Sequence, residues 1–201
     1  MRIISGQYGG RGLRTTEGPG YRPATSKVRQ SIFSMLEARG VQWQGLRVAD
    51  LFAGSGSLAI EALSRGADFA CLVEKSTKAA QLIRSNLETL GVERSRVAVR
   101  TADVAQTLRH IPQKAYDVIF IDPPYSKGLL IPALRGVLEH GWLAPEGFVL
   151  AEVEISVEPA NDPDLPTGLD LITDRVYGQT RIVLWQHSTP AWQSIPERSI
   201  P

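Results

Sequence analysis

One short run of residues, Asp122-Pro123-Pro124-Tyr125, has the composition of a site that binds an amino group. It follows the nearly continuous apolar run 116–121, which predicts a buried strand. Two consecutive prolines fix φ and remove two N–H donors, so backbone carbonyls stay free to accept hydrogen bonds beside the Asp122 carboxylate. Tyr125 adds a ring on which a flipped nucleobase can stack. A Pro-Pro turn without function is the alternative, and a terminal Asp after a buried strand makes it the weaker one.

A second candidate site begins at residues 46–52, another apolar run that predicts a buried strand. Small residues follow at 53–57, and a helical pattern starts at Leu58. Strand, glycine turn and helix is how an open α/β sheet forms a nucleotide-sized crevice, and Gly54 and Gly56 let the backbone approach a ligand closely. The same letters fit the G-x-G-x-x-G/A dinucleotide fingerprint, and the glycines could equally serve only the turn. This stretch alone therefore does not identify the ligand.

Acidic residues lie at or near the ends of four successive predicted strands: Asp50, Glu74, Asp103 and Asp122. Because the carboxyl ends of parallel strands share one edge of a sheet, we expect these carboxylates to line one crevice. Glu74 can accept hydrogen bonds from ribose hydroxyls and Asp103 from an adenine amino group, while Asp50 could face an ammonium group or water. Clustered negative charge disfavours a pyrophosphate and favours a cationic sulfonium nucleoside. Chance solvation of loop starts is the alternative.

The remaining pattern predicts the elements that position these residues. A helix is expected from a cap at Thr25 or Ser26 to Gly40. Further strands are expected at 70–73, 96–100, 116–121 and 148–153, and further helices at 58–65, 76–90, after Asp103 and at 129–138. This alternation predicts a parallel sheet covered on both faces. Residues 169–177 and 180–186, joined by a tight turn, predict a terminal β-hairpin.

Composition limits the kind of protein. A chain of 201 residues that is 43% hydrophobic can bury one α/β core. It has no apolar run long enough for a membrane span or a signal peptide, so we expect no membrane contact and a cytoplasmic location. The single cysteine, Cys71, lies in an apolar run and is expected in the core. Three scattered histidines offer no ligand spacing, so we expect no metal.

The net charge of +1 conceals an asymmetry, because residues 1–47 carry eight Lys or Arg and only two acids. A basic, glycine-rich arm predicts contact with a phosphate backbone, and an ordinary solvated face is the alternative. We therefore expect a basic N-terminal extension at 1–40, an α/β domain at 41–187 and a flexible polar tail at 188–201. The candidate RNA contacts in the extension are Arg2, Arg11, Arg14, Arg22, Lys27 and Arg29.

Together these motifs resemble the class I S-adenosylmethionine-dependent methyltransferases of the amino-methylating type. More closely, the chain resembles the RsmD family of bacterial small-subunit ribosomal RNA guanine-N2 methyltransferases, over about residues 1–185. The resemblance rests on Met1-Arg-Ile-Ile-Ser-Gly6, Arg22-Pro23 with Val28-Arg29, Asp50-Leu-Phe-Ala-Gly-Ser-Gly-Ser-Leu58, Glu61-Ala-Leu-Ser-Arg-Gly-Ala67, the tetrad from Asp122 to Tyr125, and Tyr177-Gly178.

The resemblance implies a Rossmann-like fold with a seven-stranded, mostly parallel sheet and an antiparallel last strand. It implies methyl transfer from S-adenosylmethionine to the exocyclic N2 of a guanine in 16S ribosomal RNA, with catalysis at Asp122, Pro123, Pro124 and Tyr125. The expected partner is that RNA or a small ribosomal subunit, complete or partly assembled, and the enzyme is expected to act as a monomer. The residues assigned to the cofactor are Asp50, Phe52, Gly54, Gly56, Glu74, Lys75, Asp103 and Val104.

The residues leave other functions open. Methylation of a DNA adenine N6 or a protein glutamine is one, although those groups typically have Asn where Asp122 stands. A non-catalytic RNA-binding assembly factor is another, and the complete set of strand-end acids argues against it. A dinucleotide oxidoreductase is the third, and it predicts binding of a nicotinamide cofactor.

Overall fold

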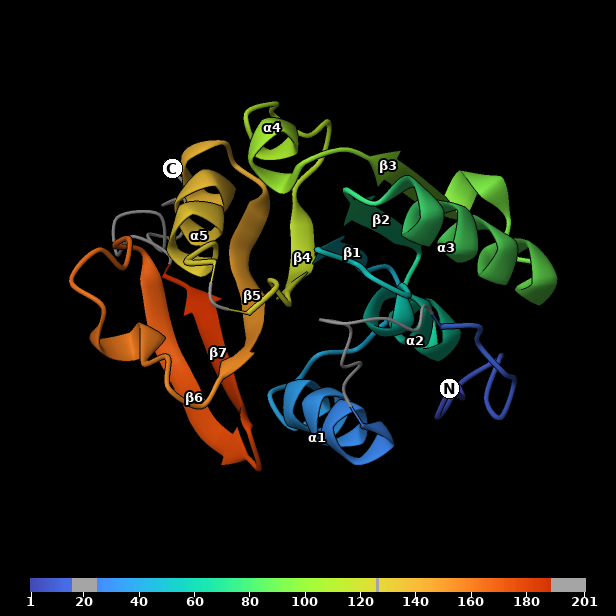
Figure 1. Cartoon of the computed structure of the whole chain (residues 1–201), viewed down its shortest axis with the longest axis horizontal. Coiled ribbons are helices and arrows are strands. Elements are labelled where there is room, and N and C mark those ends of the chain that lie inside the picture. The colour runs from blue at the N-terminus through green and yellow to red at the C-terminus, as the bar shows by residue number, and fades with distance from the viewer. Residues whose placement is uncertain (16–24, 126, 189–201) are drawn as a thin grey trace, which may run out of the picture.

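The computed structural model describes residues 1–15, 25–125 and 127–188. A seven-stranded sheet forms the centre of the molecule, with helices on both faces (Figure 1). The strands are β1 (Arg47–Leu51), β2 (Phe69–Glu74), β3 (Val97–Thr101), β4 (Tyr116–Ile121), β5 (Leu143–Glu154), β6 (Leu169–Tyr177) and β7 (Thr180–His187). The helices are α1 (Ser26–Glu37), α2 (Ser57–Arg65), α3 (Thr77–Leu90), α4 (Val104–Leu108) and α5 (Leu130–Glu139), with 3-10 turns η1 (Arg94–Arg96) and η2 (Pro159–Asn161).

The strand order is β3-β2-β1-β4-β5-β7-β6. Strands β1 to β5 pair in parallel. From β1, the chain first adds β2 and β3 on one side and then adds β4 and β5 on the other side, so the direction in which strands are added reverses at β1. In open α/β sheets, ligands bind outside the carboxyl ends of the strands at such a reversal. Strand β7 pairs antiparallel with both β5 and β6. The predicted Rossmann-like sheet with a C-terminal antiparallel hairpin is confirmed.

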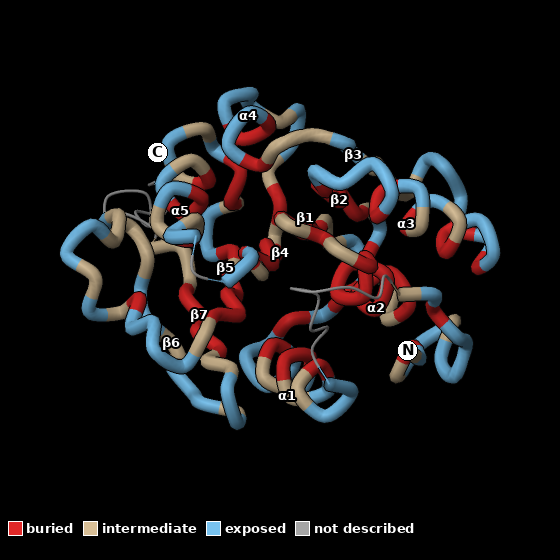
Figure 2. Tube along the Cα trace, in the orientation of Figure 1, coloured by how far each residue is buried: buried red, intermediate tan, exposed pale blue. Residues whose placement is uncertain are grey.

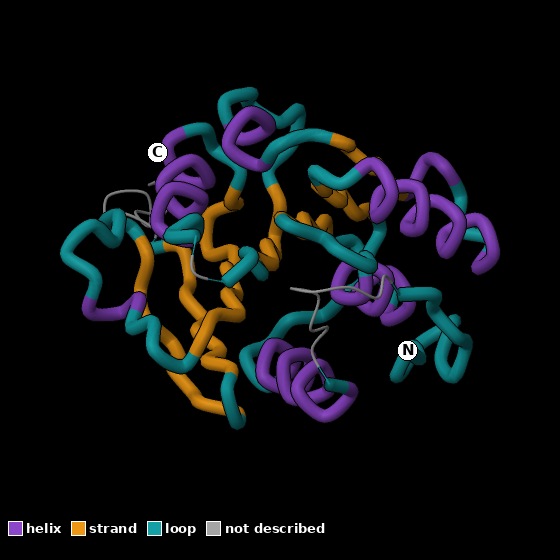
Figure 3. The backbone as a smooth tube through the Cα atoms, viewed as in Figure 1, coloured by secondary structure: helices purple, strands orange, loops and turns teal. Residues whose placement is uncertain are grey.

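Alternate residues of each strand face opposite sides of the sheet and enter different cores. In β1, Val48 packs with α1, α2 and α3, whereas its neighbour Ala49 packs with α4 and α5. Figure 3 shows these two helix layers around the strands, and Figure 2 shows that the central strands are buried along their length. The predicted core position of Cys71 is confirmed, since it is 1% exposed.

Strand β5 is longer than predicted, because it begins at Leu143 rather than Phe148. Leu143 pairs with Tyr116, and the register then shifts before Phe148 pairs with Val118. The intervening Glu146 has φ 59°, a conformation rare for a residue with a side chain. A turn-like sequence inside an irregular strand explains why the pattern predicted a strand only at residues 148–153.

The N-terminal segment packs on the sheet domain instead of forming a core of its own. Ile3 and Leu13 are 2% and 4% exposed, and they share a core with α1 and β1. The segment is fixed to α2 by the buried Glu61 carboxylate, which accepts hydrogen bonds from the N–H groups of Ile4 (2.7 Å) and Ser5 (3.0 Å). Gly6 has φ +81°, and a Cβ there would lie 1.8 Å from the Ser64 carbonyl oxygen. Contact this close requires glycine.

Candidate functional site

The glycine loop between β1 and α2 is held in a strained and closely packed conformation. Phe52 has φ 66°, which costs energy for a residue with a side chain and is typical of functional sites. Gly54 and Gly56 also have positive φ. A Cβ on Gly56 would lie 2.8 Å from Leu72 Cδ2, so this turn depends on glycine for both conformation and space.

Three of the predicted acids lie on the same face of the sheet at one edge. Asp50 is the penultimate residue of β1 and lies two residues after the core residue Val48. Glu74 and Asp122 follow the core residues Leu72 and Phe120 by the same two-residue step. The N–H of Asp122 donates to the Leu51 carbonyl at 3.4 Å, which continues the β1–β4 pairing. The expected carboxylate edge is therefore present.

Glu74 holds the glycine loop, and Asp50 holds the first turn of α2 that follows it. Glu74 Oε2 accepts a hydrogen bond from the Gly54 N–H (2.8 Å), and Oε1 accepts one from the Ser76 N–H (2.7 Å). Asp50 is 2% exposed, and its Oδ2 accepts from the Ala59 N–H (3.2 Å). Burial raises the pKa of Asp50 to about 8, the Ala59 hydrogen bond opposes that rise, and the nearby Glu74 adds to it.

Asp103 stands at the outer end of the edge and caps α4. Its Oδ1 accepts from the Ala105 N–H (2.9 Å) and its Oδ2 from Lys75 Nζ (3.3 Å). Burial acts to raise the pKa of Asp103, but the hydrogen bonds from Lys75 and the backbone leave that pKa lowered. The carboxylate thus stays ionised and partly exposed. Val104, in contrast, is 4% exposed and packs in the core beneath α4.

The tetrad after β4 lies next to this edge. Pro123 is buried, and Tyr125 is 38% exposed with its hydroxyl 3.4 Å from Thr180 Oγ1 at the start of β7. The pKa of Asp122 is raised well above its ordinary value, first by burial and then by the charges of Glu152 and Asp50. A strongly perturbed carboxyl group close in sequence to a partly exposed aromatic ring is typical of a catalytic site.

Glu152 is a fourth carboxylate in this row, and the sequence interpretation missed it because it lies inside an apolar strand. It follows Ala151, the partner of Ile121, and so lies opposite Asp122 on the neighbouring strand. Glu152 is 3% exposed, and burial raises its pKa to about 7. The sequence did contain a signal for it. Glu152 lies two residues after Leu150 in the predicted strand 148–153, so it faces the same side of the sheet as Leu150, which shares a core with Phe120.

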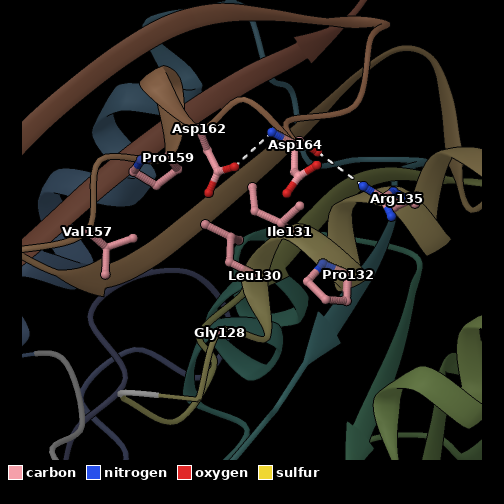
Figure 4. Close-up of a pocket in the computed structure, with 9 residues that line it drawn as sticks. All are labelled: Gly128, Leu130, Ile131, Pro132, Arg135, Val157, Pro159, Asp162 and Asp164. Atoms are coloured by element: carbon pink, nitrogen blue, oxygen red, sulfur yellow. Dashed lines mark hydrogen bonds between the residues drawn. The ribbon is translucent and has the colours of Figure 1, made fainter.

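Two neighbouring hollows lie beside the start of α5, and Gly128, Leu130 and Val157 line both. The smaller, of about 50 Å³, is lined by Pro123, Pro124 and Tyr125. The larger, of about 350 Å³, lies between the start of α5 and the segment that precedes β6 (Figure 4). Among the described residues, Asp162 and Asp164 line the larger one together with a single cation, Arg135, so its net negative charge disfavours a phosphate group.

The predicted RNA contacts differ in their availability. Arg14 and Lys27 are exposed. The Arg2 guanidinium donates to the Gly10 carbonyl, and that of Arg11 donates to the Thr89 and Leu90 carbonyls at the end of α3. These bonds give both arginines a structural role, although their side chains lie at the surface. Arg22 lies outside the described residues.

Arg29 does not fit its predicted RNA contact and is corrected here. It is fully buried, and its Nη2 donates to the Arg2 carbonyl at 2.8 Å. Burial lowers the pKa of Arg29, opposed by the charge of Glu61. The side chain therefore joins α1 to the N-terminal segment and is inaccessible to a phosphate.

Two features are missing from the part of the chain that the structure describes. Its His, Cys, Asp and Glu side chains form no group that could hold a metal ion. No helix within those ranges is long and apolar enough to cross a membrane.

The fold and the carboxylate edge define a class I methyltransferase-like α/β protein. Residues 1–186 match the family described as Conserved hypothetical protein 95, so the chain belongs to that family. It is 36% identical to the Escherichia coli (strain K12) protein named ribosomal RNA small subunit methyltransferase D, covering 92% of this chain and 89% of that one. The relationship to the RsmD family predicted from the motifs is confirmed.

Solved structures agree with this assignment. The Escherichia coli protein yhhF superposes with a TM-score of 0.81 at 32% identity, covering 94% of this chain and 99% of that one. A hypothetical protein of Thermus thermophilus gives 0.75 at 27% identity, covering 92% and 98%. SMU.776, solved in complex with SAH, shares the fold alone, at 14% identity and a TM-score of 0.63, with 83% of this chain and 50% of that one covered.

Proposed function

We propose that this protein transfers a methyl group from S-adenosylmethionine to the exocyclic N2 of a guanine in 16S ribosomal RNA. The observation that carries the proposal is the Asp122-to-Tyr125 tetrad, adjacent to a glycine loop that Glu74 holds and to the first turn of α2 that Asp50 holds. The name of the Escherichia coli relative supports small-subunit ribosomal RNA as the substrate. The choice of guanine N2 rests on the family resemblance and on Asp at the first position of the tetrad.

The protein groups at the β2 end of the edge fit this cofactor. Glu74 and Asp103 supply carboxylate acceptors for ribose hydroxyls and an amino group, and the glycine loop brings backbone close to the ligand. Asp50 is a carboxyl group whose raised pKa a nearby cation would lower. Bound there, the cofactor supplies an electrophilic methyl group on a sulfonium.

The tetrad residues position the acceptor. Tyr125 stacks on the flipped guanine, while the Asp122 carboxylate and the Pro123 carbonyl accept hydrogen bonds from the two N2 hydrogens. This arrangement directs the nitrogen lone pair towards the methyl group, and alignment contributes most of the rate. Asp122 then takes up the proton that N2 releases, for which its raised pKa suits it.

The RNA is expected to approach from the exposed basic residues Arg14 and Lys27 and to avoid the acidic hollow beside α5. The proposal includes a cytoplasmic enzyme that acts as a monomer on naked RNA or on an assembling or complete small subunit.

The test is methyl transfer from labelled S-adenosylmethionine to small subunits from cells that lack this protein, followed by nucleoside analysis. We expect label in N2-methylguanosine of 16S RNA. Label in another nucleoside would refute the guanine-N2 assignment, and cofactor binding without any transfer would favour a non-catalytic assembly role.

A further inference from the structure

Glu152 is buried beside the tetrad with an acceptor atom that the protein leaves unused. Its Oε2 is shielded from solvent and has no hydrogen-bond partner among the described residues. A buried, unsatisfied carboxylate oxygen is costly, and such groups call for an explanation. The neighbouring Asp122 increases this cost. It follows Ile121, the last residue of β4 and the partner of Ala151, so it lies opposite Glu152, and the two charges repel each other.

The position of Glu152 relative to Asp122 matches the hydrogen-bonding edge of one nucleobase. Adjacent parallel strands lie about 4.8 Å apart, so two carboxylates at one register level can contact neighbouring atoms of one ring. In guanine the exocyclic amino group is adjacent to a ring N–H, at N1. In adenine and cytosine the ring nitrogen beside the amino group is an acceptor. Two adjacent carboxylates therefore favour guanine over both.

We propose that Glu152 recognises the target base by accepting a hydrogen bond from guanine N1–H while Asp122 binds the N2 amino group. This assignment rests on the proposed function, and it gives the tetrad a specificity element on a different strand. A base with an acceptor at N1 would place two lone pairs against each other in a buried site, which costs far more than a missing contact.

A substrate base that differs from guanine only at N1 and at position 6 tests the proposal. Once nucleoside analysis has located the modified guanine, 16S RNA is assembled from ligated fragments with either guanine or 2,6-diaminopurine at that position and reconstituted into subunits. Diaminopurine keeps the 2-amino group but has an acceptor at N1. At about pH 8.5, where Glu152 with its pKa of about 7 is ionised, we expect kcat/KM of the wild-type protein to be about 30-fold lower on diaminopurine. Comparable rates on both substrates would overturn the proposal without any protein variant.

The Glu152→Gln variant separates recognition of N1 from other differences between the two bases. Its amide can donate to the diaminopurine N1, so the guanine-to-diaminopurine ratio of kcat/KM should fall at least about tenfold. The loss of guanine O6 affects both proteins equally and cancels in this comparison. Glu146→Gln, which removes an exposed charge from the same strand, should keep the wild-type ratio.

A purely structural role for Glu152 predicts a different result. Substitution would then change thermal stability and overall activity but leave the substrate ratio at its wild-type value, and that outcome would refute the proposal. If the wild-type protein forms no N2-methylguanosine on the guanine substrate, the proposed function itself fails. If it forms N2-methylguanosine without discrimination, only the role of Glu152 fails.

Discussion

The two ends of the carboxylate edge differ in how many of their carboxylate oxygens accept hydrogen bonds from the protein itself. At the cofactor end, defined by Glu74 and Asp103, both oxygens of each carboxylate accept hydrogen bonds from protein donors. At the acceptor end, defined by Asp122 and Glu152, burial raises both pKa values, and the charge of Glu152 raises that of Asp122 further. Glu152 Oε2 has no hydrogen-bond partner among the described residues.

This difference indicates that the two ends do different work. The cofactor end is formed before any ligand binds, because its hydrogen bonds also fix the glycine loop and α4. The acceptor end holds two carboxyl groups in an unfavourable environment that donors of a substrate would relieve. Four changes, from the largest expected effect to the smallest, test this division.

Asp122→Ala should lower kcat at least about 10³-fold, since it removes the acceptor of the N2 hydrogens and the released proton. Single-turnover methyl transfer to small subunits measures the effect. Asp170→Ala, an exposed change on β6, is the matched control and should keep full activity. Substantial turnover by Asp122→Ala would place the acceptor site elsewhere.

The stability of the protein should fall between about pH 4.5 and pH 7 because Glu152, at the acceptor end, is buried. A carboxyl group whose pKa is higher in the folded protein holds its proton more tightly in the folded state than in the unfolded state. For Glu152 the pKa rises from 4.5 to about 7, so the free energy of unfolding decreases as the pH rises between these two values. In Glu152→Gln this decline should shrink by an amount on the order of 3 kcal/mol. Urea unfolding across this pH range measures it. An unchanged pH dependence would show that Glu152 titrates normally.

Glu74→Gln should weaken S-adenosylmethionine binding about 10- to 100-fold with a smaller effect on kcat. The amide keeps one acceptor oxygen and turns an NH₂ group towards an N–H donor, so the glycine loop loses a hydrogen bond. Calorimetric titration of the cofactor measures the change, with the exposed Glu88→Gln on α3 as control. Unaltered affinity would remove Glu74 from the cofactor end.

Lys75→Ala should change cofactor affinity no more than about threefold. Lys75 pairs with Asp103 at 3.3 Å, but its side chain is 80% exposed and the ion pair is weakened by solvent. Lys78→Ala, exposed on the first turn of α3, provides a baseline for the same titration. A tenfold loss in Lys75→Ala alone would mean that Lys75 contacts the cofactor directly.

The sequence predicted the elements of the edge because local signals define them. The apolar run 116–121 ends where β4 ends, and the glycine turn begins where β1 ends. Glu152 was missed because the sequence of a strand does not show whether an acid within it is buried. That depends on which strand pairs beside it, and here Asp122 lies opposite. Arg29 was misplaced for the related reason that a distant segment covers α1 and accepts its hydrogen bond. Long-range contacts of this kind leave no periodic signal in the sequence.

The division of the edge is tested most directly by the affinity of Asp122→Ala for S-adenosylmethionine, measured by calorimetry on the preparation that has lost turnover. The account predicts a dissociation constant within about threefold of the wild-type value, because Glu74, Asp103 and the glycine loop are unchanged. A loss of cofactor affinity as large as the loss of turnover would contradict it and would show that both ends form a single site.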